Sequence, residues 1–127
     1  MTVEKFQFPA DPNNTGYSLF PEHLEENPNV FFHGTAASNL PSIFERGFIP
    51  APPLESVSFA KASSVALGYA CSKRSSNSPE GCVIAVHYGE INRSGIAVET
   101  AVLYDYTRVP PPIIIGYCIV PATYSHV

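Results

Sequence analysis

The chain has 127 residues, the size of one domain, and 45% of them are hydrophobic, which is enough for a single buried core. Eleven Asp and Glu residues outnumber seven Lys and Arg residues, so the net charge is −4. Sequence-independent binding of nucleic acid requires a surplus of cations, and this balance argues against it. No apolar run reaches the ~18 residues that cross a bilayer, so we expect no membrane partner.

The N-terminus and the cysteines indicate the compartment. The first residues lack the basic and apolar regions of a signal peptide. Cys71, Cys82 and Cys118 form no C-x-x-C pair, which argues against a zinc site, and we expect no metal. We interpret these thiols as reduced and mostly buried, as in a cytoplasmic protein. A Cys71–Cys82 disulfide is the alternative if the mature protein is secreted.

The chain begins with an irregular segment. Residues 1–28 are rich in the Asp, Asn, Pro and Gly residues that form turns, and a short helical turn is expected at 21–26. We interpret this segment as an N-terminal wrap around residues 29–127, within one domain overall.

Apolar patterns predict helices and strands in the rest of the chain. Apolar residues recur at the i, i+3, i+4 spacing of a helix over residues 39–46, which Gly47 ends, and over 62–70. Alternating or β-branched apolar runs predict strands at 29–33, 56–60, 82–88, 98–104 and 113–120. Short helices that come early and strands that dominate later indicate an α+β fold with mixed or antiparallel sheets.

One ordered set of residues carries recognisable chemistry. His33-Gly34-Thr35 ends the first expected strand, Ser58-Phe59-Ala60 ends the second, and Tyr69 follows on a helix. Glu99 then precedes an apolar segment that ends in Tyr104-Asp105. Over roughly residues 29 to 120, this arrangement resembles the catalytic domain of the diphtheria-toxin-like branch of ADP-ribosyltransferases, which includes the poly(ADP-ribose) polymerases.

The resemblance implies a fold and a reaction. The fold would be two packed mixed or antiparallel β-sheets with short flanking helices, and residues 29–127 would be the catalytic domain. The substrate would be NAD, whose nicotinamide–ribose bond breaks through an oxocarbenium-like transition state. The product would be a mono-ADP-ribosylated protein or other macromolecule, or free ADP-ribose if water is the acceptor. The small size and the single bare domain also suggest a toxin or an effector delivered into a host cell.

By resemblance, the first two blocks would hold the substrate. His33 would bond a hydroxyl of the adenosine ribose, and Thr35 would add a contact to the same ribose. The Gly34 backbone would hold the carboxamide, because glycine allows a close approach. Ser58 and Phe59 would belong to the same binding site. A turn glycine at Gly34 and a purely structural histidine at His33 are the alternatives.

Tyr69 and Glu99 would act on the reacting end of NAD. Tyr69 would stack on the nicotinamide ring. Glu99 would orient the nicotinamide ribose and steady the developing cation, which at about 4 Å and a dielectric of ~20 is worth roughly 4 kcal/mol, or about a thousandfold in rate. The alternatives are a core tyrosine at Tyr69 and a solvated strand-end carboxylate at Glu99. Lys61, Arg93 and Arg108 could meet the pyrophosphate, but an exposed face is the favoured place for each.

Two departures from the family pattern bear on activity. Ser58 stands where the family has a second stacking Tyr, and the family's Glu falls on Thr100, one residue after Glu99. A strict strand register would aim Glu99 away from the pocket, and a β-bulge near residues 97–100 would correct the aim. These departures favour mono-transfer or NAD hydrolysis over chain elongation.

Two alternatives to the transferase remain. One is an inactive domain of the same fold that binds NAD, ADP-ribose or a protein partner. The other is an RNA 2′-phosphotransferase-like enzyme, which would need several basic residues that this acidic chain lacks.

Overall fold

The structure is a computed structural model that describes residues 3–107 and 109–125. Arg108, one of the cations considered above, lies outside the described residues. The strands are β1 (Glu4–Phe6), β2 (Val30–Ala36), β3 (Val57–Ala60), β4 (Gly81–His87), β5 (Ile96–Glu99), β6 (Val102–Asp105) and β7 (Ile113–Val120). The helices are α1 (Glu22–Glu25), α2 (Leu40–Arg46) and α3 (Ser63–Ser72), with 3₁₀ turns at Pro12–Thr15 and Ala37–Asn39.

The described strands form one sheet in the order β1-β7-β4-β2-β3-β6-β5. Neighbours run antiparallel except β1 and β7, which are parallel, so the sheet is mixed. The prediction of an α+β fold is therefore confirmed. The prediction of two packed sheets is wrong, because β2 and β3 are paired and join all the strands into one sheet.

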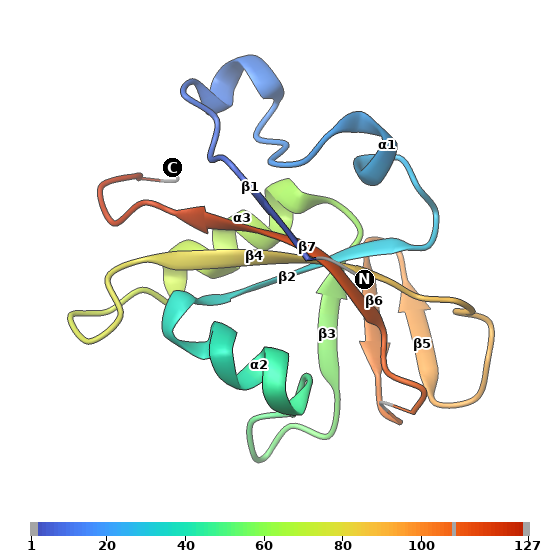
Figure 1. Cartoon of the computed structure of the whole chain (residues 1–127). Coiled ribbons are helices and arrows are strands. Elements are labelled where there is room, and N and C mark those ends of the chain that lie inside the picture. Colours follow the sequence, from blue (N-terminus) through green and yellow to red (C-terminus); the bar gives the residue numbers. More distant parts are fainter. Residues whose placement is uncertain (1–2, 108, 126–127) are drawn as a thin grey trace.

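The sheet is nearly divided between β2 and β3. These two strands share a single residue pair, Phe32 with Ala60, whereas β2 pairs with β4 along its whole length from Val30 to Ala36. Figure 1 shows the consequence: β3, β6 and β5 run across the direction of β2 and β4. Beyond Phe32, none of the described strands pairs with the edge of β2 that faces β3.

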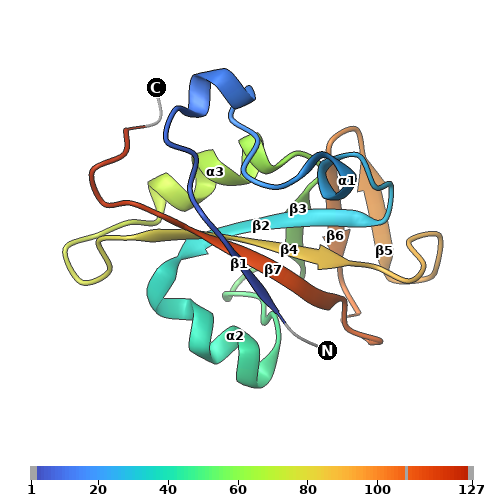
Figure 2. The same cartoon turned by 45° about the horizontal axis from the view of Figure 1, so that its top comes forward.

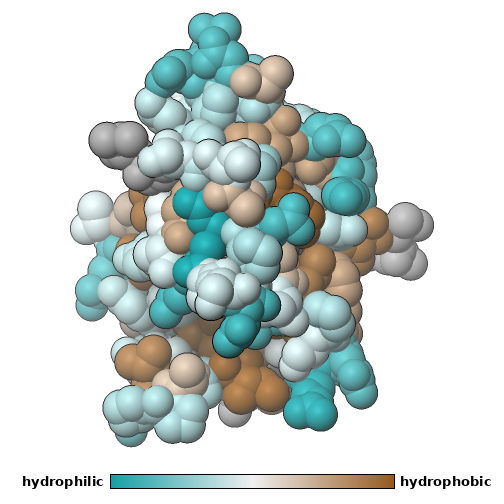
Figure 3. Space-filling view, turned by 90° about the vertical axis from the view of Figure 1, so that its left-hand side faces the viewer, coloured by the Kyte–Doolittle hydropathy of each residue, from teal (hydrophilic) through white to brown (hydrophobic). Residues whose placement is uncertain are grey.

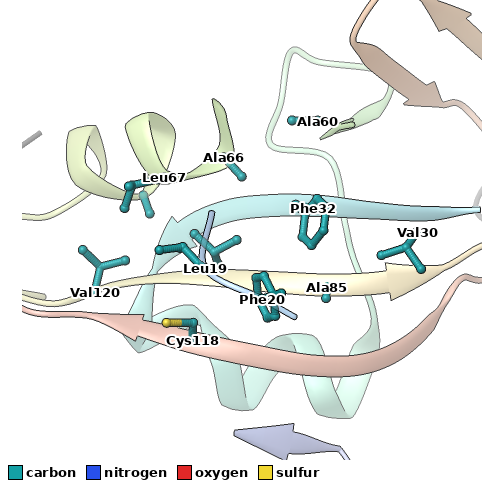
Figure 4. Packing of buried hydrophobic residues seen from close by; sticks show 12 residues of the cluster. Leu19, Phe20, Val30, Phe32, Ala60, Ala66, Leu67, Ala85, Cys118 and Val120 are labelled. Carbon is teal, nitrogen blue, oxygen red and sulfur yellow. The ribbon is translucent and has the colours of Figure 1, made fainter. Parts of the chain in front are cut away.

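Helices cover both faces of the larger part of the sheet. Figure 2 shows α3 on one side of β2 and β4, and α2 on the other. On the α3 side, Phe32, Ala66, Leu67 and Val120 belong to a buried cluster that also takes in residues of the N-terminal segment, as Figure 4 shows. A second buried cluster lies on the α2 side. The described residues thus form two cores, one on each side of the sheet.

The N-terminal segment contributes to the first core. Leu19 and Phe20 are buried against the α3 side of the sheet, and β1 adds an edge strand beside β7. The predicted helical turn is α1. The wrap is therefore less irregular than its composition indicates, since tertiary contacts supply the order that its turn residues do not.

One predicted strand is wrong. Residues 98–104 are not a single strand, because a turn at Thr100 and Ala101 joins β5 to β6 as a hairpin. Thr100 has a φ of 49°. A β-branched residue rarely adopts this left-handed conformation, so local sequence did not predict the turn. The four other predicted strands are β2, β3, β4 and β7, with ends that differ by a few residues, whereas β1 was not predicted.

No helix among the described residues is long and apolar enough to cross a membrane. No disulfide joins the three cysteines, which all lie among the described residues, and Cys82 and Cys118 are buried.

Gly34 determines how closely α3 approaches β2. A Cβ atom at Gly34 would lie 2.0 Å from the carbonyl oxygen of Ala66 and 2.8 Å from the amide nitrogen of Ala70. Only glycine therefore allows the helix backbone to rest on the strand. The close approach that the sequence suggested for a ligand is used, on this face, by the protein's own helix.

We expect Gly34→Ala to destabilise the fold by more than about 3 kcal/mol, because the displaced atoms are backbone and cannot move without shifting α3. Urea denaturation measures the effect. Gly89→Ala is the matched control, since a Cβ there meets nothing within 4 Å. Equal stabilities of the two variants would contradict this account of the helix–strand contact.

Candidate functional site

A cleft of about 540 Å³ opens where β2 and β3 diverge. It is lined by the unpaired part of β2, by β3, by the end of α3, and by α2 with the loop that follows it. Pockets of this size hold small-molecule ligands in other proteins. The position follows from the sheet, because two strands that separate leave an open space edged by their own peptide groups.

The cleft brings together most of the predicted site residues. Its lining contains the whole His33-Gly34-Thr35 block of β2, Ser58 and Phe59 of β3, and Tyr69 of α3. These residues come from three separate segments of the sequence. Glu99 is the one predicted site residue that does not line the cleft.

His33 is positioned by a hydrogen bond across the divided sheet. Its Nδ1 lies 2.9 Å from the carbonyl oxygen of Ser58. A carbonyl oxygen only accepts, so Nδ1 carries the hydrogen and donates it. The ring also packs edge-to-face against Phe48 at 5.1 Å and lies 5.4 Å from Phe59. The imidazole therefore has a fixed orientation between β2 and β3.

Burial lowers the pKa of His33, and the positive charge of Lys73 lowers it further, although the bond to Ser58 opposes the shift. The ring is therefore neutral at pH 7. With Nδ1 as the donor, Nε2 is left as a hydrogen-bond acceptor. His33 can accept a hydroxyl from a ligand in the cleft.

Thr35 and Tyr69 form different parts of the lining. Thr35 is buried, and its hydroxyl oxygen accepts a hydrogen bond from the side-chain amide of Asn39 at 2.9 Å. Asn39 is the residue before α2, and its side chain makes no capping hydrogen bond to the helix. Tyr69 is 57% exposed, so the alternative of a core tyrosine is wrong. Its neighbours Ala66 and Ala70 are the buried face of α3.

Glu99 lies just outside the cleft. It is exposed at the end of β5, and its cross-strand partner on β6 is Val102, which does line the cleft. The β5–β6 register is regular from Ile96 to Glu99, so no β-bulge interrupts this stretch. Paired residues point to the same face, which places Glu99 on the face of Val102 and Ala60. The register therefore places the Glu99 side chain on the α3 side of the sheet, the side to which Val102 and Ala60 also point.

Sequence reasoning missed Lys73 and the loop after α2. Lys73 follows α3 and lines the cleft. Phe48, Ile49 and Leu54 line it from the loop, with Leu54 66% exposed. Neither Lys73, as a polar residue next to a polar loop, nor the prolines of the loop after α2 indicate from sequence that they line the same cleft. The run of prolines and apolar residues at 48–54 was the only available hint.

Two of the cations considered for the pyrophosphate, Lys61 and Arg93, donate to backbone carbonyls instead. The Lys61 ammonium donates to the carbonyl oxygens of Asn27 and Val30 at 2.9 and 3.0 Å. The Arg93 guanidinium donates to backbone carbonyls outside the cleft, among them that of Val109. Within the described residues, no cluster of His, Cys, Asp and Glu side chains could hold a metal ion.

Comparison with known proteins adds no family assignment. No family model matches the chain, and no curated protein matches its sequence. The function is therefore argued from the cleft itself.

The lowered pKa of His33 predicts a pH-dependent stability. Below pH 6.5, the ordinary value, the unfolded chain binds a proton at this histidine before the folded protein does. The free energy of unfolding should therefore fall as the pH is lowered from 6.5 through the lower pKa of the folded state, whereas above 6.5 this contribution is complete.

Urea denaturation between pH 5 and pH 8 tests this expectation. The loss of stability at acid pH should be smaller in His33→Gln than in His23→Gln, which changes an exposed histidine on α1. The same pH dependence in both variants would show that another group is responsible.

Proposed function

We propose that the cleft binds NAD and that the protein cleaves its nicotinamide–ribose bond, as a mono-ADP-ribosyltransferase or an NAD glycohydrolase. The observation that carries the proposal is the convergence of His33, Ser58 and Tyr69 on one cleft. They come from β2, β3 and α3, and the resemblance to ADP-ribosyltransferases selects them together as the binding residues.

The chemistry of the lining suits the parts of a dinucleotide. The Nε2 atom of His33 is available to accept a ribose hydroxyl. Tyr69 and Phe48 offer aromatic surface for a flat heterocycle. The unpaired edge of β2 beside Gly34 provides peptide N–H and C=O groups, which is the pairing that a carboxamide requires.

The proposed reaction breaks the bond between ribose C1′ and the nicotinamide nitrogen. The bonding electron pair goes to that nitrogen, which turns the pyridinium into neutral nicotinamide and leaves positive charge on the ribose. An acceptor group or water then forms the new bond to C1′ and releases its proton to solvent. A carboxylate near C1′ stabilises the positive charge.

Glu99 is our candidate for this carboxylate. It lies beside the cleft on the face of Val102, and none of the described residues that line the cleft carries a carboxylate. Its exposed position fits a residue that acts at the mouth, where an acceptor enters.

Tyr69→Ala should weaken NAD binding by about 1–3 kcal/mol, the usual contribution of one aromatic stacked on a base. Isothermal titration calorimetry measures the dissociation constant. Tyr69→Phe should keep the affinity, because the ring remains. Tyr106→Ala is the matched control, since Tyr106 is also half-exposed but lies outside the cleft lining. Equal losses in the two alanine variants would remove Tyr69 from the proposed site.

Glu99→Gln should lower the rate of nicotinamide release by up to about a thousandfold while leaving NAD affinity within a few-fold. The substitution removes the charge and keeps the shape. Glu90→Gln, in the exposed loop before β5, is the control. Quantifying nicotinamide by chromatography, with labelled NAD to detect transfer, separates hydrolysis from transfer. An unaltered rate in Glu99→Gln would contradict this role.

A second candidate function is an inactive domain that binds NAD or ADP-ribose. Two observations favour it: Glu99 does not line the cleft, and Ser58 presents no second aromatic ring. The wild-type protein decides between the two. Binding without nicotinamide release would support the inactive domain, and release that Glu99→Gln abolishes would support the enzyme.

A further inference from the structure

We propose that Lys73 forms an anion subsite at the Thr35 end of the cleft, and that it selects ligands that carry a phosphate group. The inference rests on the proposed function in that it assigns a ligand class to the same cleft. It adds a specificity residue on the loop after α3, outside the blocks that the family resemblance covers.

The charge of the cleft lining is positive. Lys73 is the one Lys, Arg, Asp or Glu side chain among the described residues that line it. Glu55 lies in the loop between two lining residues, Leu54 and Ser56, but is not itself part of the lining. In a protein with a net charge of −4, a ligand cleft with a cation and no carboxylate favours an anion.

The ammonium of Lys73 is available to a ligand. Within the described ranges it has no hydrogen bond or ion pair, and the side chain is exposed. Its neighbour Arg74 differs, because its guanidinium donates to the carbonyl oxygen of Pro121 at 2.7 Å. The two adjacent cations therefore have separate roles: Arg74 fastens the end of α3 to the chain after β7, and Lys73 faces the cleft.

The fold places Lys73 beside the block on β2. Ala70, one turn before Lys73, packs on Gly34 and on Gly81, and Gly81 pairs with Ala36 at the end of β2. The charge of Lys73 also reaches His33, whose pKa it lowers. Figure 3 views the molecule from the end where α3 terminates and shows mainly hydrophilic side chains across its centre.

Other polar groups that line the cleft can complete a phosphate site. The Thr35 hydroxyl accepts from Asn39, so its own hydrogen is free to be donated. Asn39 and Ser42 also line the cleft, from the 3₁₀ turn and from α2. A phosphate oxygen would receive a charge-assisted hydrogen bond from Lys73 and neutral ones from these groups.

The phosphate could be the pyrophosphate of a dinucleotide or a phosphate on the ribose itself. Calorimetry with ADP-ribose and with adenosine 2′-monophosphate distinguishes these sources, and adenosine serves as the phosphate-free probe. We expect Lys73→Gln to weaken the binding of ADP-ribose or of adenosine 2′-monophosphate, whichever places its phosphate at the subsite, by about tenfold. The same variant should bind adenosine within twofold of the wild-type affinity. The affinity for the phosphate ligand should also depend less on salt than it does in the wild type. Lys73→Arg should retain most of the affinity. Lys5→Gln, on the edge strand β1, is the control.

Several outcomes would overturn the subsite. These are unchanged binding of both phosphate ligands by Lys73→Gln, an equal loss for adenosine, and no binding of either phosphate ligand or of inorganic pyrophosphate by the wild type. A Lys73 that only stabilises the end of α3 would give the second result. Phosphate selectivity without NAD cleavage would leave the subsite standing and remove the transferase. A Lys73→Gln variant that binds both phosphate ligands as tightly as the wild type, in a protein that cleaves NAD, would remove the subsite and leave the transferase standing.

Discussion

The divergence of β2 from β3 is the constraint on which the rest of the structure depends. Strands that stay paired use their peptide groups on each other, whereas these two share only Phe32 and Ala60. The sheet continues through that pair, and beyond it the two strands become the walls of a cleft. The hydrogen bond from His33 to the carbonyl oxygen of Ser58 crosses the same gap. This bond fixes the orientation of the imidazole and also holds the two walls of the cleft together.

A second constraint is the close contact of α3 with β2. Ala66 and Ala70 let the helix backbone come down onto Gly34, and the small residues on both sides leave no room for a larger one. This contact leaves Tyr69 on the exposed flank of the helix, where it lines the cleft. The glycine that a sequence reader takes for a ligand contact thus positions the aromatic residue that would contact the ligand.

Much of this arrangement could be predicted from the sequence. Apolar periodicity located α2, α3 and most strands, and the ordered blocks selected residues that share one cleft. The hairpin at Thr100 could not be predicted, because a threonine with positive φ contradicts local preference. The sequence also left the exposure of Tyr69 undetermined, because its helical spacing fits both the buried face and the exposed margin of the apolar stripe. Lys73 escaped notice because its role depends on where α3 ends relative to β2, which is a tertiary property.

The position of Lys61 has a consequence for how the molecule responds to ligands. Its ammonium binds carbonyl oxygens of Asn27 and Val30, so the residue that directly follows β3 is tied to the start of β2. The cleft opens at the opposite end of the same strand pair. A ligand bound there would contact both strands at the end where they diverge, so that β2 and β3 would be linked at both ends. Ligand binding in the cleft should therefore slow amide hydrogen exchange along β2 and β3 together, because the two strands would open as one cooperative unit.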